Sequence, residues 1–203
     1  MVATRMKKED RIQHILDATL ALVGRKPMES IRTAEIAKES EISEGALFKY
    51  FTSKSEIINH ILAQYENKSH PITPAEKITT VGEFRVFIDD YLSSLINMTP
   101  ERIAYLRLLL QVSMGNGKLG GIKYKQVKDG FWAILEDRIK YGQSHWGFNQ
   151  NIDIRIQIRL FHFSVLMFLI EQEIFNAKEI ESFELEKVKL IAISNFFDVL
   201  QGA

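Results

Sequence analysis

The residues whose types and spacing suggest a binding function lie together in one stretch, residues 33–54. Ser43 directly precedes a helix-like segment, and a serine hydroxyl at that position can accept a hydrogen bond from the first amides of a helix. Gly45 and Ala46 follow, and small side chains near the start of a helix let that end approach a DNA major groove closely. The segment therefore has the composition of a helix that reads base edges.

Side chains on the outward face of this segment offer donors and acceptors to bases and phosphates. Lys49 can donate to guanine O6 or N7, Glu44 can accept from cytosine N4, and Tyr50 is expected on the same face. Thr33 and Lys54 stand at the starts of the preceding and following helices, where we expect them to hold phosphates. The expected DNA contacts are Thr33, Ser43, Glu44, Gly45, Ala46, Lys49, Tyr50 and Lys54.

Two short helices position these side chains. Residues 33–39 and 44–50 have helical spacing, and the few residues between them form a turn, which predicts a helix-turn-helix. Ala37 is small enough to let the second helix pack closely on the first. The apolar residues expected at the contact are Ile36, Ala37, Ile42 and Leu47.

This stretch resembles the N-terminal motif of the TetR family of transcriptional regulators. The matching positions read Thr33, Glu35, Ile36-Ala37, Glu41-Ile42, Leu47-Phe48-Lys49-Tyr50-Phe51 and Lys54. The motif itself is specific only over roughly residues 5–62, and the rest of the chain resembles the family in its layout alone. The resemblance implies a dimeric DNA-binding regulator that responds to a small-molecule effector.

Two positions depart from the family pattern. Glu41 stands where the family has a turn glycine, so we expect a slightly different turn, because glutamate adopts a left-handed conformation at some cost. Phe48 stands where the family usually has a tyrosine, so its ring has no hydroxyl for a phosphate. Tyr50 replaces the usual histidine and is expected to restore one such contact.

The chain as a whole predicts an all-α fold of about nine helices. Apolar residues follow helical spacing almost everywhere, and the proline-containing segment 69–74 marks a boundary. We expect a helix-turn-helix DNA-binding domain over residues 1–68 and an effector-binding and dimerisation domain over residues 69–203. The helices are expected near residues 12–23, 33–39, 44–50, 53–67, 81–97, 100–114, 122–146, 153–176 and 184–201.

The last two helices are expected to form a homodimer interface. Leu160–Ile170 is apolar nearly all round, and the last helix has a similarly small polar face. Helices of this kind are covered on every side, and a second subunit is the natural cover in a chain of this size. Phe168 and Phe197 are the expected interface residues, and TetR-like dimers resemble this arrangement. A larger core within one chain is the alternative.

Aromatic residues between the boundary and these helices suit an apolar ligand cavity, although they suit a solid core equally well. The family resemblance implies an effector there, which we expect to be largely apolar. His162 and Arg107 are its possible polar anchors, and His162 otherwise reads as a core histidine. The expected pocket residues are Phe84, Phe87, Tyr91, Arg107, Phe131, Trp132 and His162.

Other chemistry is disfavoured by composition. Cysteine is absent and the five histidines form no metal-binding pair, so we expect no metal and no cofactor. Gly115–Gly120 matches a dinucleotide fingerprint by letter, but a helix precedes it, so a helix–helix loop is expected. No catalytic constellation, signal peptide or membrane span is visible, which predicts a cytoplasmic protein that is not an enzyme.

Charge indicates that DNA binding needs two subunits. Basic and acidic residues balance at 26 each, and residues 1–54 carry only a small basic excess. A dimer on two half-sites would double the phosphate contacts. We therefore expect a ligand-responsive repressor that binds double-stranded DNA at a palindromic operator as a homodimer. The alternative is a helix-turn-helix used for protein contacts or nucleoid association without gene regulation.

Overall fold

The computed structural model describes residues 7–67, 74–115 and 117–202, and every regular element within these ranges is helical. The predicted all-α class is therefore confirmed. The chain forms two compact units, here called the first unit (residues 1–69 and 98–120) and the second unit (residues 70–97 and 121–203). The expected division was between residues 68 and 69, with all later residues in one domain. In the structure the segment 98–120 instead belongs to the first unit, because α6 packs with the N-terminal helices.

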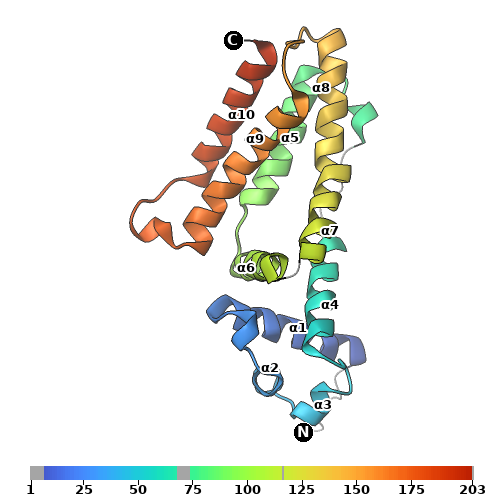
Figure 1. Cartoon of the computed structure of the whole chain (residues 1–203), viewed down its shortest axis with the longest axis vertical. Coiled ribbons are helices and arrows are strands. Elements are labelled where there is room, and N and C mark those ends of the chain that lie inside the picture. The colour runs from blue at the N-terminus through green and yellow to red at the C-terminus, as the bar shows by residue number, and fades with distance from the viewer. Residues whose placement is uncertain (1–6, 68–73, 116, 203) are drawn as a thin grey trace. The chain divides into compact units, whose positions relative to one another are not determined.

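The first unit is built around its N-terminal helix, α1, whose apolar face is covered by α2, α4 and α6. The helices are labelled in Figure 1. The elements of the first unit are α1 (Lys8–Arg25), the 3-10 turn η1 (Met28–Ser30), α2 (Thr33–Glu39), α3 (Glu44–Leu47), α4 (Lys54–Asn67) and α6 (Pro100–Gly115).

One hydrophobic core joins these helices. Ile15 and Val23 of α1 are buried against residues of α2, α3 and α4, and Leu108 adds α6 to the same cluster. The helix-turn-helix is thus held from behind by apolar side chains, which leaves its other face for a partner. Buried members of this core on the motif and after it are Ile36, Ala37, Leu47, Phe51, Ile57 and Ile61.

The second unit contains the long C-terminal helices. Figure 1 shows α10 running beside α9 and α5, and these pairs are in contact. Its elements are η2 (Ala75–Lys77), α5 (Val81–Ile96), most of α7 (Gly117–Val127, of which residues 117–120 belong to the first unit), the π-helix η3 (Lys128–Trp132), α8 (Ala133–His145), α9 (Ile154–Leu169), the π-helix η4 (Ile170–Ile174), η5 (Ala177–Glu179) and α10 (Leu185–Gln201).

Helix α7 continues through η3 into α8 without a break. Counted as one helix, these segments give nine helices among the described residues, with the short 3-10 turns left out. The predicted helix 122–146 is therefore confirmed, but it begins earlier, at Gly117. The loop expected at Gly115–Gly120 is wrong: Gly115 ends α6, residues 117–120 are helical, and Asn116 lies outside the described residues. The expected boundary segment 69–74 also lies outside them, except for its last residue.

One local prediction is corrected near the motif, and the helix that follows begins with a side-chain cap. The helix expected to reach Tyr50 ends at Leu47, because the amides of Lys49 and Tyr50 bond the third residue back, as in a tightened turn. At α4, the Ser53 hydroxyl accepts from the Glu56 amide at 3.2 Å, as a capping residue does. The Glu56 carboxylate, however, accepts from the Thr52 amide and hydroxyl, one residue before the position a capping box requires.

No helix among the described residues is both long enough and apolar enough to cross a lipid bilayer.

Candidate nucleic-acid interface

The turn between α2 and α3 is fixed by a left-handed residue. Glu41 has a φ of 54°, the conformation that a glycine would adopt most easily. The Ile42 amide then donates to the Ala37 carbonyl at 2.9 Å, and this bond closes the turn. Glu41 therefore adopts the left-handed conformation itself, in the place where the family has a glycine.

Hydrogen bonds among four of the predicted residues stabilise the start of α3. The Ser43 hydroxyl accepts from the Ala46 amide at 3.1 Å, so Ser43 caps the helix as expected. The Thr33 hydroxyl donates to a carboxylate oxygen of Glu44 at 2.5 Å, which joins the starts of α2 and α3. The Thr33 hydroxyl therefore donates to Glu44 in this structure. The other carboxylate oxygen of Glu44 can accept a hydrogen bond from another donor.

The surface of α3 and the following turn is formed by small, aromatic and basic side chains. Gly45 and Lys49 are exposed, and a Cβ atom added at Gly45 would meet nothing within 4 Å. No packing within the chain therefore demands glycine there. Phe48 has 48% of its surface exposed beside Lys49. Sequence reasoning treated Phe48 only as a lost hydroxyl, yet exposed phenylalanine is an apolar surface that can contact a thymine methyl.

Lys54 does not present its ammonium group as predicted. Its Nζ donates to three backbone carbonyls, of Met28 at 2.9 Å, Ile31 at 3.0 Å and Glu29 at 3.4 Å. An ammonium group has three N–H donors, so all of them are used within the protein. The expected phosphate contact is replaced by a structural one: Lys54 ties α4 to η1.

Tyr50 also differs from the prediction. It is half-buried, and its ring packs on the hydrophobic core of the first unit. Its amide donates to the Leu47 carbonyl at 2.9 Å in the tightened turn after α3.

Several basic residues near the motif are paired with acids. Arg25 binds Glu39, and Lys26 binds Glu35. The hydrogen bond from Lys26 is the main cause that lowers the pKa of Glu35, followed by the bond from the Arg32 amide. These pairs cancel charge beside α2, so Lys49 stands out as an exposed basic side chain on the turn after α3.

The aromatic residues predicted to line a cavity pack against one another instead. The rings of Tyr91 and Phe131 are stacked with centroids 3.4 Å apart, and Phe87 lies 5.7 Å from Phe131. Trp132 lies 5.4 Å from His162, edge to face. In this conformation the side chains themselves fill the predicted cavity, as in a solid core.

Two residues predicted for that cavity lie elsewhere. Phe84 packs with Trp146, Phe148 and Phe197 in a separate cluster. Arg107 belongs to the first unit, where its guanidinium donates to the Gly24 carbonyl at 3.4 Å. Sequence order alone did not reveal that α6 packs with the N-terminal helices, so the assignment of Arg107 as an anchor is corrected.

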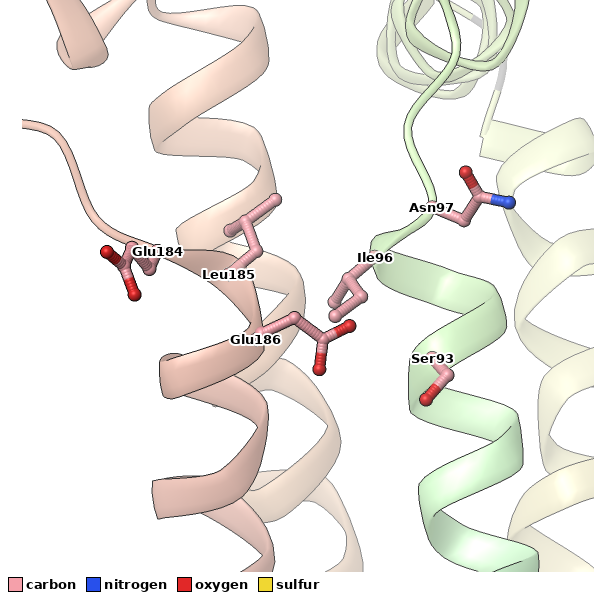
Figure 2. Close-up of a pocket in the computed structure, with 6 residues that line it drawn as sticks. All are labelled: Ser93, Ile96, Asn97, Glu184, Leu185 and Glu186. Carbon is pink, nitrogen blue, oxygen red and sulfur yellow. The ribbon is translucent and has the colours of Figure 1, made fainter.

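A surface pocket of about 660 Å³ lies between the end of α5 and the start of α10. Figure 2 shows its lining residues on these two segments. The Ser93 hydroxyl accepts from Lys189 Nζ at 2.7 Å, and Glu186 also pairs with Lys189, so two of its polar groups have partners. None of the predicted pocket residues lines it. The lining residues are Ser93, Ile96, Asn97, Glu184, Leu185 and Glu186.

The predicted interface residues separate into one core residue and one partly buried residue. Phe197 is 1% exposed and packs within its own chain against Phe84 and Phe148, so its assignment to a subunit interface is wrong. Phe168 is half-buried and contacts Phe183 edge to face. The outward face was misjudged because both faces of α10 are apolar.

Exposed apolar residues instead follow one side of α9. They recur at spacings of four, three and four residues, which places them on one helical stripe. We call this the α9 stripe. Exposed Leu190 and Ile191 add apolar surface on α10, which packs beside α9. The α9 stripe consists of Ile156, Leu160, Phe163 and Met167.

Comparisons with known proteins agree with this architecture. Residues 15–61 match the model of the family described as bacterial regulatory proteins, tetR family. The chain is 33% identical over 57 residues to the HTH-type transcriptional repressor KstR of Rhodococcus jostii, covering 28% of this chain and 27% of KstR. It is 36% identical over 66 residues to the nucleoid occlusion factor SlmA of Mannheimia succiniciproducens, covering 32% and 31%. These alignments span less than a third of each curated relative.

Solved structures match over nearly the whole chain. NalD, the secondary repressor of the MexAB-OprM multidrug efflux pump in Pseudomonas aeruginosa, superposes with a TM-score of 0.66 at 16% identity, covering 96% of this chain and 98% of NalD. GusR of Salmonella enterica gives 0.66 at 15% identity, covering 98% and 100%. At such low identity these likenesses concern the fold alone.

Proposed function

We propose that this chain, a member of the TetR family, is a transcription regulator that reads DNA with α3 and the turn after it. One observation carries the proposal: an exposed surface of Gly45, Phe48 and Lys49 lies on a helix-turn-helix whose other face is fixed by the core. Small side chains allow close approach, and a lysine supplies a donor for guanine. Ser43, Glu44 and Ala46 set the start of the reading helix.

The proposed operator is a palindrome bound by two subunits. The α9 stripe and the exposed apolar residues of α10 are the surface proposed to meet a second copy of the chain. Burial of such a stripe by its two-fold mate would resemble the packing of a core. Two reading heads then require half-sites about 34 Å apart, which is one turn of DNA.

The experiment that tests this function is selection of bound DNA from random sequence, followed by affinity measurement at several salt concentrations. The expected result is one palindromic sequence whose affinity falls steeply with salt, because lysine and arginine release counterions from phosphates. Enrichment of unrelated sequences, or binding that does not depend on salt, would contradict sequence-specific regulation.

Repression is the proposed outcome of operator binding. KstR and NalD, which resemble this chain in sequence and in fold respectively, both carry the name of repressor. We further propose a small-molecule effector that alters operator affinity. This effector is supported by the aromatic composition of the second unit, where rings from α5, η3 and α9 are in contact.

Nucleoid association is the second candidate function. The similarity over 66 residues to a nucleoid occlusion factor favours it, because that alignment is as strong as the one to the repressor. The two functions differ in where the protein binds in the cell. Mapping of bound sites across the genome should show a few promoters for a regulator and many dispersed sites for a nucleoid protein.

A further inference from the structure

Phe48 is an exposed aromatic residue within the helix-turn-helix. It has 48% of its surface exposed, and no other large apolar side chain is exposed among the described residues 7–65. Phe51, three residues later, is 2% exposed and packs edge to face on His60, with ring centroids 5.3 Å apart. A single exposed apolar residue is ordinary on a protein surface, so the place of Phe48 in the motif decides what it can do.

Phe48 shares a face of α3 with two other exposed residues. Its amide donates to the Glu44 carbonyl at 3.1 Å, which is the four-residue spacing of an α-helix. Residues three and four apart on a helix are neighbours on its surface, so Phe48 lies beside Glu44 and Gly45, both of which are exposed. Exposed Lys49 follows directly. The phenylalanine ring therefore belongs to the surface that we propose reads DNA.

Gly45 leaves the space beside this ring open. A helical side chain leans over the turn that precedes it, so the surface next to the Phe48 ring is that of Gly45 and its neighbours. A Cβ atom added at Gly45 would meet nothing within 4 Å. No side chain at this position therefore stands between the ring and an approaching base edge.

The backbone that carries the ring is fixed at both ends of α3. Leu47, directly before Phe48, is 1% exposed and belongs to the core of the first unit. At the other end, the Ser43 hydroxyl accepts from the Ala46 amide at 3.1 Å. The exposure of Phe48 is thus a property of an ordered helix end, and an ordered side chain is what recognition of one base requires.

The chemistry of the base edges selects one contact for such a ring. In the major groove the bases present hydrogen-bond donors and acceptors, and thymine alone adds an apolar group, its 5-methyl. A phenylalanine ring has no donor or acceptor, so against another base it would cover polar atoms without bonding them, which is unfavourable. Against the thymine methyl it buries apolar surface on both molecules. Thymine is therefore the base that Phe48 can distinguish.

We infer that Phe48 determines sequence specificity by contacting the 5-methyl group of one thymine in each operator half-site. The tyrosine that is usual at this position in the TetR family carries a hydroxyl group that suits a phosphate. Phe48 has no such group, so its contribution to binding is apolar. The inference rests on the proposed function, because it names a base that α3 and the following turn read.

Replacement of thymine by uracil tests this directly, because it removes the methyl group and keeps the hydrogen-bonding edge. Each thymine of the operator selected from random sequence is replaced in turn, in both half-sites together, and the affinity of the full-length protein is measured by fluorescence anisotropy. At one position uracil should weaken binding by about threefold to tenfold for each half-site, the value expected for one buried methyl group. An apolar contact releases no counterions, so this ratio should be the same at every salt concentration.

A matched pair of variants assigns the methyl contact to the ring. Phe48→Ala removes an exposed ring, so it should bind the thymine and uracil operators equally. Lys49→Ala is the control, because Lys49 is the exposed neighbour of Phe48. It should weaken binding to both operators and keep the preference for thymine. The comparison separates the ring contact from any effect of uracil on the DNA itself, and the measurements on the unmodified protein depend on neither variant folding.

Two outcomes would overturn the inference alone. One is a selected operator in which no thymine can be replaced by uracil with a loss of affinity, and the other is a Phe48→Ala variant that keeps the full preference for thymine. In both cases the selected operator is still bound in a salt-dependent way, so the proposed regulator stands. If selection recovers no preferred DNA sequence, the proposed function and this inference are both wrong.

Discussion

Two lysines five residues apart in the motif have different environments. Lys49 is exposed on the turn after α3, whereas the ammonium of Lys54 donates to the carbonyls of Met28, Glu29 and Ile31. Lys49→Ala should weaken binding to the selected operator by about 1–3 kcal/mol and relax one base position in each half-site, with unchanged stability. Electrophoretic mobility shifts measure the affinity. Unchanged operator binding would remove Lys49 from base reading.

Lys54→Ala should instead act on stability. Removal of the ammonium leaves converging carbonyls around η1 without a donor, and a charged hydrogen bond of this kind contributes about 1–3 kcal/mol. Urea denaturation should therefore show a lower free energy of unfolding for Lys54→Ala than for Lys49→Ala. A Lys54→Ala variant that unfolds like the wild type but shows a smaller salt slope would restore the phosphate contact predicted from sequence.

Glu41 is the left-handed residue of the turn, and glycine relieves its strain. A residue with a Cβ atom pays roughly 1–2 kcal/mol in this conformation, while glycine loses more backbone entropy on folding. Glu41→Gly should therefore raise the free energy of unfolding by about 0.5–1 kcal/mol, and thermal unfolding measures it. Lys38→Gly, in the last turn of α2 and exposed, is the control and should be destabilising. A destabilising Glu41→Gly would show that the glutamate side chain has a role of its own.

His162 should make stability depend on pH. Its folded pKa of about 4 lies below the ordinary value of 6.5, so the unfolded chain binds the proton more readily. The contribution of His162 to the free energy of unfolding should therefore be greatest above pH 6.5. It should decrease as the pH drops toward 4, by up to about 1.4 kcal/mol per pH unit. In His162→Phe this part of the decline should vanish. Parallel stability curves for both proteins from pH 7 to 4 would contradict a buried, neutral His162.

At the scale of the helix, apolar spacing predicted which residues share a face but not what covers that face. The bounds of α2 agree with the prediction, and the predicted long helices are all present. Phe197 was misassigned because α10 is apolar on more than one side, and burial by α5 is a tertiary property. Lys54 was misassigned for a similar reason, since the carbonyls of η1 converge on it only in the folded chain.

The α9 stripe supplies the prediction at this scale. Leu160 is 61% exposed, so Leu160→Glu costs little in an isolated subunit but would bury an unpaired carboxylate in a dimer. Sedimentation at micromolar concentration should show a dimer for the wild type and a monomer for Leu160→Glu, with native helical content. Val86→Glu, at an exposed position on α5, is the matched control and should remain dimeric. A monomeric wild type would exclude the proposed interface.

At the scale of the whole molecule, charge makes association part of DNA binding. Acidic and basic residues balance over the chain, and ion pairs beside α2 occupy Arg25 and Lys26. The net charge of one subunit therefore does little to attract a phosphate backbone. The monomeric Leu160→Glu variant should accordingly lose most operator affinity even though its helix-turn-helix is unchanged.

The two units are linked functionally only if an effector changes operator affinity. A ligand can shift an equilibrium only by its difference in affinity for two arrangements, typically 1–3 kcal/mol. Thermodynamic linkage then requires reciprocity: operator DNA must weaken effector binding by the same factor by which the effector weakens operator binding. Calorimetric titration of a small molecule that binds the protein, with and without operator, measures one factor, and operator titration with and without that molecule measures the other. Equal factors above one support control of DNA binding by the molecule, whereas factors of one would leave it bound at a site that does not regulate DNA binding.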